Sequence, residues 1–218
     1  MPRALFEKTG KAIYISHLDL MRLFQRGFKR AGLPLTHTQG FNPRASVSIA
    51  LPLSLGVESE CELLDFDLDG DTIPCDDICS RLNEALIDGV RVRRVYSDGR
   101  KLKELAFLRC CVTLVYDAGA PANGKALLEA LFSQSELIVP KKGKNGLVNQ
   151  DIIPMIRSVM VETDNQEIRL DAVVCCQNPA LNPLQLYAAV ERYIPELRAD
   201  FVTCRRLELF DRNGDLFY

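Results

Sequence analysis

Two histidines and a row of basic residues near the N-terminus are the side chains whose types and spacing could do chemistry. Both histidines of the chain, His17 and His37, fall within the first 40 residues. Imidazoles titrate near neutral pH, so a pair of them can act as general acid and general base, for example on the 2′-hydroxyl of RNA. With Asp19 they could also form a metal site. Both alternatives require the two rings to lie close together.

A helix is predicted to position these basic residues. Ser16 is a typical N-cap, Asp19 follows in the capping-box position, and Gly32 and Pro34 end the helix. Apolar residues recur on one helical face: Leu20, Leu23, Phe24, Phe28 and Ala31. The basic residues occupy the opposite face: Arg22, Arg26, Lys29 and Arg30. Such a face is typical either of a solvated helix with an Asp19–Arg22 pair or of an anion-binding surface.

The turn-rich segment that follows favours the binding alternative. Residues 38–44 bring amide, aromatic and guanidinium groups together in one short loop, and exposed loops often carry binding groups. Aromatic and amide side chains can read unpaired bases while Lys and Arg contact phosphates. The predicted binding surface comprises His17, Arg22, Arg26, Arg30, His37, Gln39, Phe41, Asn42 and Arg44. Lys141, Lys142 and Lys144 could extend it.

The remaining patterns predict an α+β fold of two tandem ferredoxin-like (split β-α-β) halves with mainly antiparallel sheets, as domains 1–98 and 104–218. The first half is expected to contain two extended segments within 3–15, the helix from Ser16, strands 34–37, 46–53 and 61–68, a helix 76–88 and a strand 90–96. The second is expected to contain strands 107–116, 137–141, 152–162, 168–176 and 202–210, with helices 124–132 and 183–193.

A slightly negative net charge is unusual for a protein that binds nucleic acid, but the distribution of the charges along this chain removes that objection. The formal net charge is −2, but residues 1–50 carry +6, residues 51–90 carry −10 and residues 91–110 carry +5. The near-neutral total is therefore a cancellation. The acidic block could equally bind a protein partner or simply keep a sheet edge soluble. With 47% hydrophobic residues and no long apolar run or secretory leader, the chain is expected to be globular and cytoplasmic.

The cysteines are expected to be free thiols rather than metal ligands. The chain has 8 cysteines and no CxxC pair. Cys75 and Cys79 have the Cx3C spacing that opens a cluster motif, but no third cysteine follows within reach, whereas an iron–sulfur site needs three or four thiolates. We therefore expect no metal site and no cofactor in this chain.

Two motifs give the chain a family resemblance. ISHLDLMR at residues 15–22 and QGFNP at residues 39–43, with further matches over about residues 3–68, resemble the radical SAM-linked protein family, a bacterial domain of unknown function. The chain departs from the family pattern at Arg44, Ala45 and Ser46, where the family has His-Pro and a basic residue. Any acid–base or metal role of that family histidine is therefore in doubt here.

The resemblance implies an accessory or substrate-binding protein that works with a radical SAM enzyme, and it hints at RNA, such as tRNA or rRNA. The partner enzyme would use S-adenosylmethionine and an iron–sulfur cluster. This chain has no Cx3Cx2C and no phosphate-binding or HExxH motif, so we expect no catalytic activity of its own. Two alternatives stay open: a metal-independent RNA-processing enzyme that uses His17 and His37, and an adaptor that contacts only the partner protein.

Overall fold

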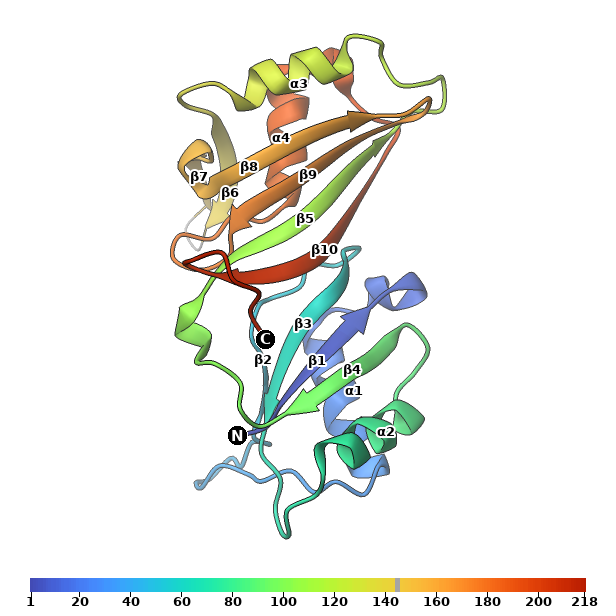
Figure 1. Cartoon of the computed structure of the whole chain (residues 1–218), viewed down its shortest axis with the longest axis vertical. Helices are drawn as coiled ribbons and strands as arrows, with labels where there is room; N and C mark the ends of the chain where they lie inside the picture. The colour runs from blue at the N-terminus through green and yellow to red at the C-terminus, as the bar shows by residue number, and fades with distance from the viewer. Residues whose placement is uncertain (144–145) are drawn as a thin grey trace. The chain divides into compact units, whose positions relative to one another are not determined.

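The protein divides into two compact units. The structure, a computed structural model, describes residues 1–143 and 146–218 (Figure 1). Unit 1 comprises Met1–Glu104 together with Phe217–Tyr218, and unit 2 comprises Leu105–Leu216. The last two residues thus group with unit 1, where the Phe217 ring lies over Arg100 and the Tyr218 ring lies over Arg94.

Unit 1 alternates strands and helices around one small sheet. Its elements are β1 (Arg3–Lys8), α1 (His17–Arg30), β2 (Val47–Ile49), β3 (Glu58–Phe66), α2 (Cys75–Ala85) and β4 (Val90–Tyr96), with 3₁₀ turns at Gly10–Tyr14 and Leu102–Glu104. β1 pairs with both β3 and β4, and β2 pairs with β3, always antiparallel. The strand order is therefore β4-β1-β3-β2.

Aromatic side chains join the helices of unit 1 to its sheet. The rings of Phe6 on β1 and Phe24 on α1 meet edge to face with centroids 4.7 Å apart. Phe28 on α1 lies 4.8 Å from Phe66 on β3. Ile78 and Leu82 of α2 enter the same buried cluster, so both helices cover one face of the sheet (Figure 1). Burial of these rings stabilises the packing of α1 against the sheet.

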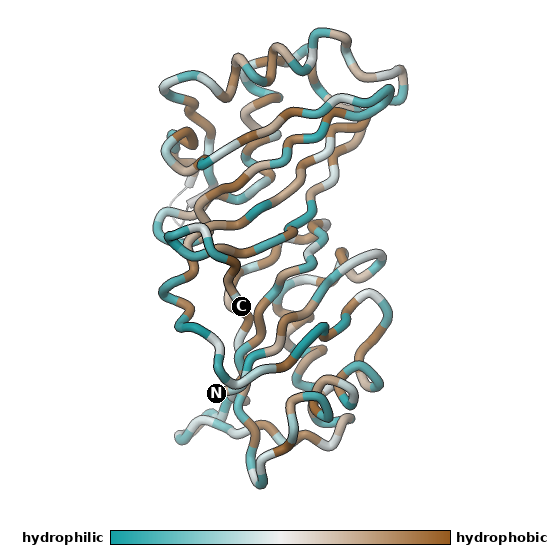
Figure 2. The backbone as a smooth tube through the Cα atoms, in the orientation of Figure 1, coloured by the Kyte–Doolittle hydropathy of each residue, from teal (hydrophilic) through white to brown (hydrophobic). Residues whose placement is uncertain are grey.

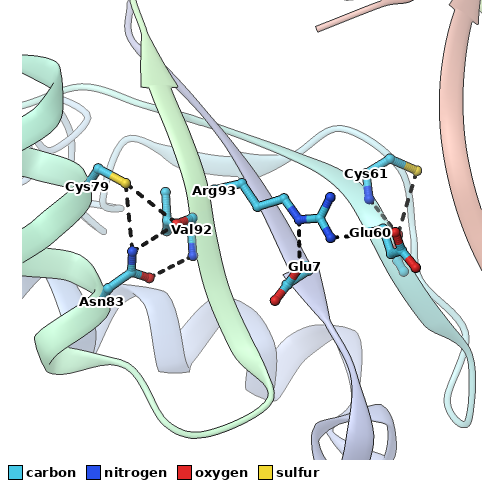
Figure 3. A network of polar contacts seen from close by, with 8 residues as sticks. Glu7, Glu60, Cys61, Cys79, Asn83, Val92 and Arg93 are labelled. Carbon is cyan, nitrogen blue, oxygen red and sulfur yellow. Dashed lines mark hydrogen bonds and ion pairs between the residues drawn. The ribbon is translucent and has the colours of Figure 1, made fainter.

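A side chain of α2 occupies the outer edge of β4. The Asn83 amide donates to the Val92 carbonyl and accepts from the Val92 N–H, both at 2.8 Å (Figure 3). On β4, Arg93 pairs with Glu7 of β1 at 2.6 Å and with Glu60 of β3 at 3.5 Å. Side chains therefore join all three strands and the helix beside them.

Unit 2 repeats the strand order of unit 1. Its elements are β5 (Leu105–Val115), α3 (Gly124–Phe132), β6 (Ile138–Gly143), β7 (Gly146–Asp151), β8 (Ile156–Thr163), β9 (Glu167–Cys175), α4 (Leu184–Tyr193) and β10 (Phe201–Asp211), with 3₁₀ turns at Ile153–Met155 and Pro195–Leu197. Antiparallel pairs give the order β10-β5-β9-β8, and β6 pairs with β7 apart from this sheet. More and less buried residues alternate along most of β5 and β9, as expected for strands with one covered face. Both strands carry hydrophobic residues along much of their length (Figure 2).

The predicted mixed α+β fold with a mainly antiparallel sheet is confirmed, and four details of the prediction are wrong. Residues 10–14 form a 3₁₀ turn rather than a second extended segment. Residues 34–37 make only two isolated bridges, from Leu35 to Leu68 and from His37 to Ala45, because the chain bends away at the loop that follows. The strand expected at 46–53 shrinks to β2. The strand expected at 152–162 begins only at Ile156, after a turn that contains a proline.

Strand β7 was not predicted at all. Its residues, Gly146–Asp151, are exposed or half-buried throughout. A strand with no buried face has no alternation of apolar and polar residues for a sequence pattern to detect.

Candidate functional site

A cavity of about 1030 Å³ lies in unit 1, between the second half of α1 and the chain from Gly32 to Val47. Its apolar wall consists of Met21, Phe28, Leu33, Pro34, Leu35, Pro43, Ala45 and Val47. Its polar lining consists of Gln25, Lys29, His37 and Arg44. No carboxylate is among these lining residues. A largely apolar concavity with a few convergent polar groups is typical of a small-ligand site.

The helical repeat of α1 decides which side chains reach the cavity. Met21, Gln25 and Lys29 follow one another at steps of four and line it. Arg22 and Arg26 form the next row around the helix, and both side chains are exposed. This row, together with Lys29, is called the basic row below. Arg22 and Arg26 therefore border the cavity without lining it, whereas Lys29 is part of its lining.

The start of α1 is fixed by two side chains. The Ser16 hydroxyl accepts a hydrogen bond from the Asp19 N–H at 3.2 Å, which confirms the predicted cap. Lys8, fully buried on β1, donates from Nζ to the carbonyls of Ile13 at 3.1 Å and Ile15 at 2.8 Å. The chain entering the helix is thus tied to the sheet.

The end of α1 forms one corner of the cavity. Gly32 has a φ of 64°, the Gly32 N–H donates to Lys29, and the Leu33 N–H donates to Phe28. These are the hydrogen bonds of a Schellman motif, which explains the glycine in the sequence. From α2, Arg81 donates to the Ala31 carbonyl at 2.9 and 2.6 Å and to the Gly32 carbonyl at 2.8 Å. One guanidinium therefore holds this corner.

The loop 38–44 forms the other border of the cavity. The Thr38 N–H donates to the Arg44 carbonyl at 2.9 Å, and the Arg44 N–H donates to the Thr38 hydroxyl at 3.0 Å. These two bonds close the loop at its base. At its tip the Phe41 side chain is fully exposed, and Gln39 and Asn42 are also exposed. An aromatic ring that packs against nothing in this chain is free to stack on a ligand.

Several cations at the site are not neutralised within the chain. Arg22 pairs with Asp19 at 3.0 Å, with both side chains more than half exposed, so the pair contributes little stability. Hydrogen bonds from Ser16 and then from Arg22 lower the pKa of Asp19 below its usual range. Within the described part of the chain, the side chains of Arg26, Lys29 and Arg44 form no hydrogen bond or ion pair. Their charge remains available to a ligand.

The structure places the predicted binding residues in three groups. His37 and Arg44 line the cavity. Arg22 and Arg26 border it, and Gln39, Phe41 and Asn42 stand on the loop beside it. Arg30 does not belong to the site: it donates to the Ala85 carbonyl at 2.6 Å, because it lies on the far side of α1 against the C-terminal end of α2.

His17 is also separate from the cavity. It is the first residue of α1, half-buried, and its Nδ1 is buried without a hydrogen-bond partner. It is not among the cavity-lining residues, whereas His37 is. Among the described residues no group of three or more His, Cys, Asp or Glu side chains could hold a metal ion, so His17, Asp19 and His37 do not assemble as a ligand set.

The cysteines are all free thiols. Four are buried and four are half-buried. Burial raises the pKa of Cys79 on α2, which disfavours the thiolate that a metal would need. Of the lysines expected to extend the surface, Lys141 donates to the Ala180 carbonyl at 3.4 Å, while Lys144 and the side chain of Lys142 lie outside the described residues.

The part of the chain that matches a known protein family includes every residue of this site. Residues 2–183 match the family described as an uncharacterized protein conserved in bacteria (DUF2344). The chain belongs to this family. No curated protein matches the chain. Among solved structures, an unknown protein from Galdieria sulphuraria is similar at 12% identity, with 94% of this chain and 96% of that chain covered and a TM-score of 0.26. No helix in the described residues is long and apolar enough to cross a membrane.

Sequence reasoning missed the cavity itself. It assigned Phe28 to the core and did not single out Met21, Gln25, Leu35 or Val47. A signal for the wall on α1 was present, since residues 21, 25, 28 and 29 share one helical face that is neither fully apolar nor fully charged. The opposite wall carried no such signal because it has no regular repeat.

Proposed function

We propose that the protein binds single-stranded RNA through the basic row and the loop 38–44. The observation that carries the proposal is the position of Arg22 and Arg26 beside a largely apolar cavity whose own lining includes Lys29 and Arg44. Cations on one surface suit consecutive phosphates, and an adjacent cavity with an exposed aromatic ring suits unpaired bases. Double-stranded RNA hides its bases and is the disfavoured ligand.

We further propose that RNA binding serves a radical SAM enzyme as partner. The support is the resemblance carried by ISHLDLMR and QGFNP, and both motifs supply residues of the site: Met21 and Arg22 from the first, Gln39 to Pro43 from the second. Co-purification of the two proteins at low and high salt tests this link. Nothing favours catalysis by a histidine pair, since only His37 lines the cavity.

We also propose that each unit has a ferredoxin-like fold. The antiparallel orders β4-β1-β3-β2 and β10-β5-β9-β8 support this, as does the placement of two helices between strands in each unit. A sheet with one face covered by helices offers a rigid support for the cavity.

Fluorescence anisotropy with a labelled single-stranded RNA tests the binding function. Arg26→Glu combined with Arg44→Glu should weaken binding at least tenfold and lower the slope of log affinity against log salt by about 1.4, near 0.7 for each lost phosphate contact. Arg212→Glu is the matched control, because Arg212 is an exposed arginine of unit 2. Equal losses in the double variant and the control, or no binding by the unaltered protein, would contradict the proposal.

A further inference from the structure

The lining of the cavity selects for one kind of ligand chemistry. Three of its large apolar residues keep some exposed surface and can contact a flat ring: Met21, Leu35 and Val47. Phe28 and Leu33, which also belong to the lining, are fully buried. The charged groups at the cavity, Lys29 and Arg44, are both cations, and no lining residue carries a carboxylate. The ligand should therefore combine an apolar body with an anionic group.

Two neutral polar groups of the lining restrict the class of ligand further. The Gln25 amide both donates and accepts, and it can pair with the edge of a heterocycle, as amides do with adenine. The imidazole of His37 offers a second edge contact. Within the described residues, neither side chain makes a hydrogen bond inside the protein. A purely aliphatic acid would gain nothing from either group, whereas a heterocycle can hydrogen-bond to both.

The loop supplies the remaining contact. Phe41 stands fully exposed three residues before Arg44, on the loop whose base is closed by the two Thr38–Arg44 bonds. Aromatic rings in such positions stack on bases of single-stranded nucleic acids.

We propose that the cavity receives one unpaired nucleobase, with Gln25 and His37 at its edge, Phe41 stacked on it or on its neighbour, and the phosphate of the same nucleotide on Lys29 and Arg44. This rests on the proposed RNA-binding function and adds to it a pocket that reads a base. The basic row then holds the strand on either side of that nucleotide.

A tryptophan reporter tests where the base lies. Because the chain has no tryptophan, Phe41→Trp introduces a single one at the loop tip. Short single-stranded oligoadenylate should quench its fluorescence. Phe201→Trp is the matched control, since Phe201 is an exposed phenylalanine of unit 2, at 61%. Quenching confined to Phe41→Trp supports the proposal. Equal quenching of both, or of neither, by an oligomer that binds overturns it.

An abasic oligomer tests the base contact with the unaltered protein. Removal of the bases should weaken binding about tenfold or more, the size of a typical stacking contribution, and leave the salt dependence unchanged. Ala45→Phe, which places a ring inside the cavity and keeps both cations, should reproduce that loss on the intact oligomer and show no further loss on the abasic one.

The results separate the two proposals. If the unaltered protein binds the intact and abasic oligomers equally, the pocket is wrong while RNA binding stands. If it binds neither, the proposed function fails, and the pocket fails with it. The abasic comparison decides the question even if Ala45→Phe does not fold.

Discussion

Single side chains that satisfy backbone groups carry much of the local order in this protein. Lys8, Asn83 and Arg81 each donate to carbonyls of a neighbouring element. In unit 2, the buried Tyr116 hydroxyl does the same, donating to the Leu197 carbonyl at 2.9 Å. Leaving a buried carbonyl unpaired costs free energy. A substitution that removes one of these donors should therefore lower the free energy of unfolding.

The ionisation of the Tyr116 hydroxyl should make the stability of the folded protein depend on pH in the alkaline range. Burial raises the pKa of Tyr116 from 10 to about 12. The folded state therefore holds this proton more tightly than the unfolded state, so the stabilisation is complete below pH 10 and is lost as the pH rises toward 12. Urea unfolding at a series of pH values should show this fall.

Tyr116→Phe supplies the control for the pH prediction. It should lower the free energy of unfolding at neutral pH by about 1 kcal/mol, through the lost hydrogen bond, and it should flatten the decline above pH 10. An equally steep alkaline decline in the variant would show that other groups cause it. Tyr96, whose pKa burial also raises to about 12, adds its own share in both proteins.

At the scale of elements, α1 links the core of unit 1 to the candidate site. One side of the helix buries Leu20, Phe24 and Phe28, and the adjoining side lines the cavity. Its C-terminal corner depends on α2, because Arg81 supplies the donors for the last carbonyls. One corner of the cavity, at Gly32, is therefore held by the contact between these two helices.

Arg81→Lys tests this dependence while keeping the charge. An ammonium cannot reproduce the planar fork that reaches both carbonyls, so the free energy of unfolding should fall by about 1 to 3 kcal/mol. Arg91→Lys, at an exposed arginine of β4, should change it by less than about 0.5 kcal/mol. Chemical denaturation measures both variants, and similar values for the two would contradict the role given to Arg81.

The two ends of α1 could be predicted from the sequence, and the cavity could not. Ser16 and Gly32 act through their nearest neighbours, so local rules locate them. The segment 34–37 reads as a strand, yet its partners are Leu68 and Ala45, and only the folded chain determines that it makes isolated bridges. A cavity depends on the packing of such irregular chain against a helix, which no periodic pattern records.

At the scale of the whole molecule, the charge blocks and the thiols are both unevenly distributed. The basic block at residues 1–50 carries the basic row and Arg44, whereas the acidic block at residues 51–90 supplies β3 and α2. Unit 2 carries five of the eight cysteines: Cys110, Cys111, Cys175, Cys176 and Cys204. Burial raises the pKa of Cys110 and of Cys204, the latter to about 12.

Alkylation of the folded protein should therefore be selective across the chain. Cys110 and Cys204 should react far more slowly than the half-buried Cys75, because they need an opening of the sheet to expose and ionise the thiol. Mass spectrometry of peptides after timed alkylation measures each rate, with urea-unfolded protein as the control for intrinsic reactivity. Comparable rates in the folded protein would contradict the burial of these two thiols.

The bonds between Asn83 and Val92 bear on how a partner protein could attach to unit 1. Many complexes form when a foreign strand adds to an open sheet edge through main-chain hydrogen bonds. At Val92 both main-chain groups are already taken by one amide side chain. A strand from outside would have to displace that amide before it could pair at Val92. A partner is therefore expected to recognise the side chains of unit 1 rather than extend its sheet at this edge.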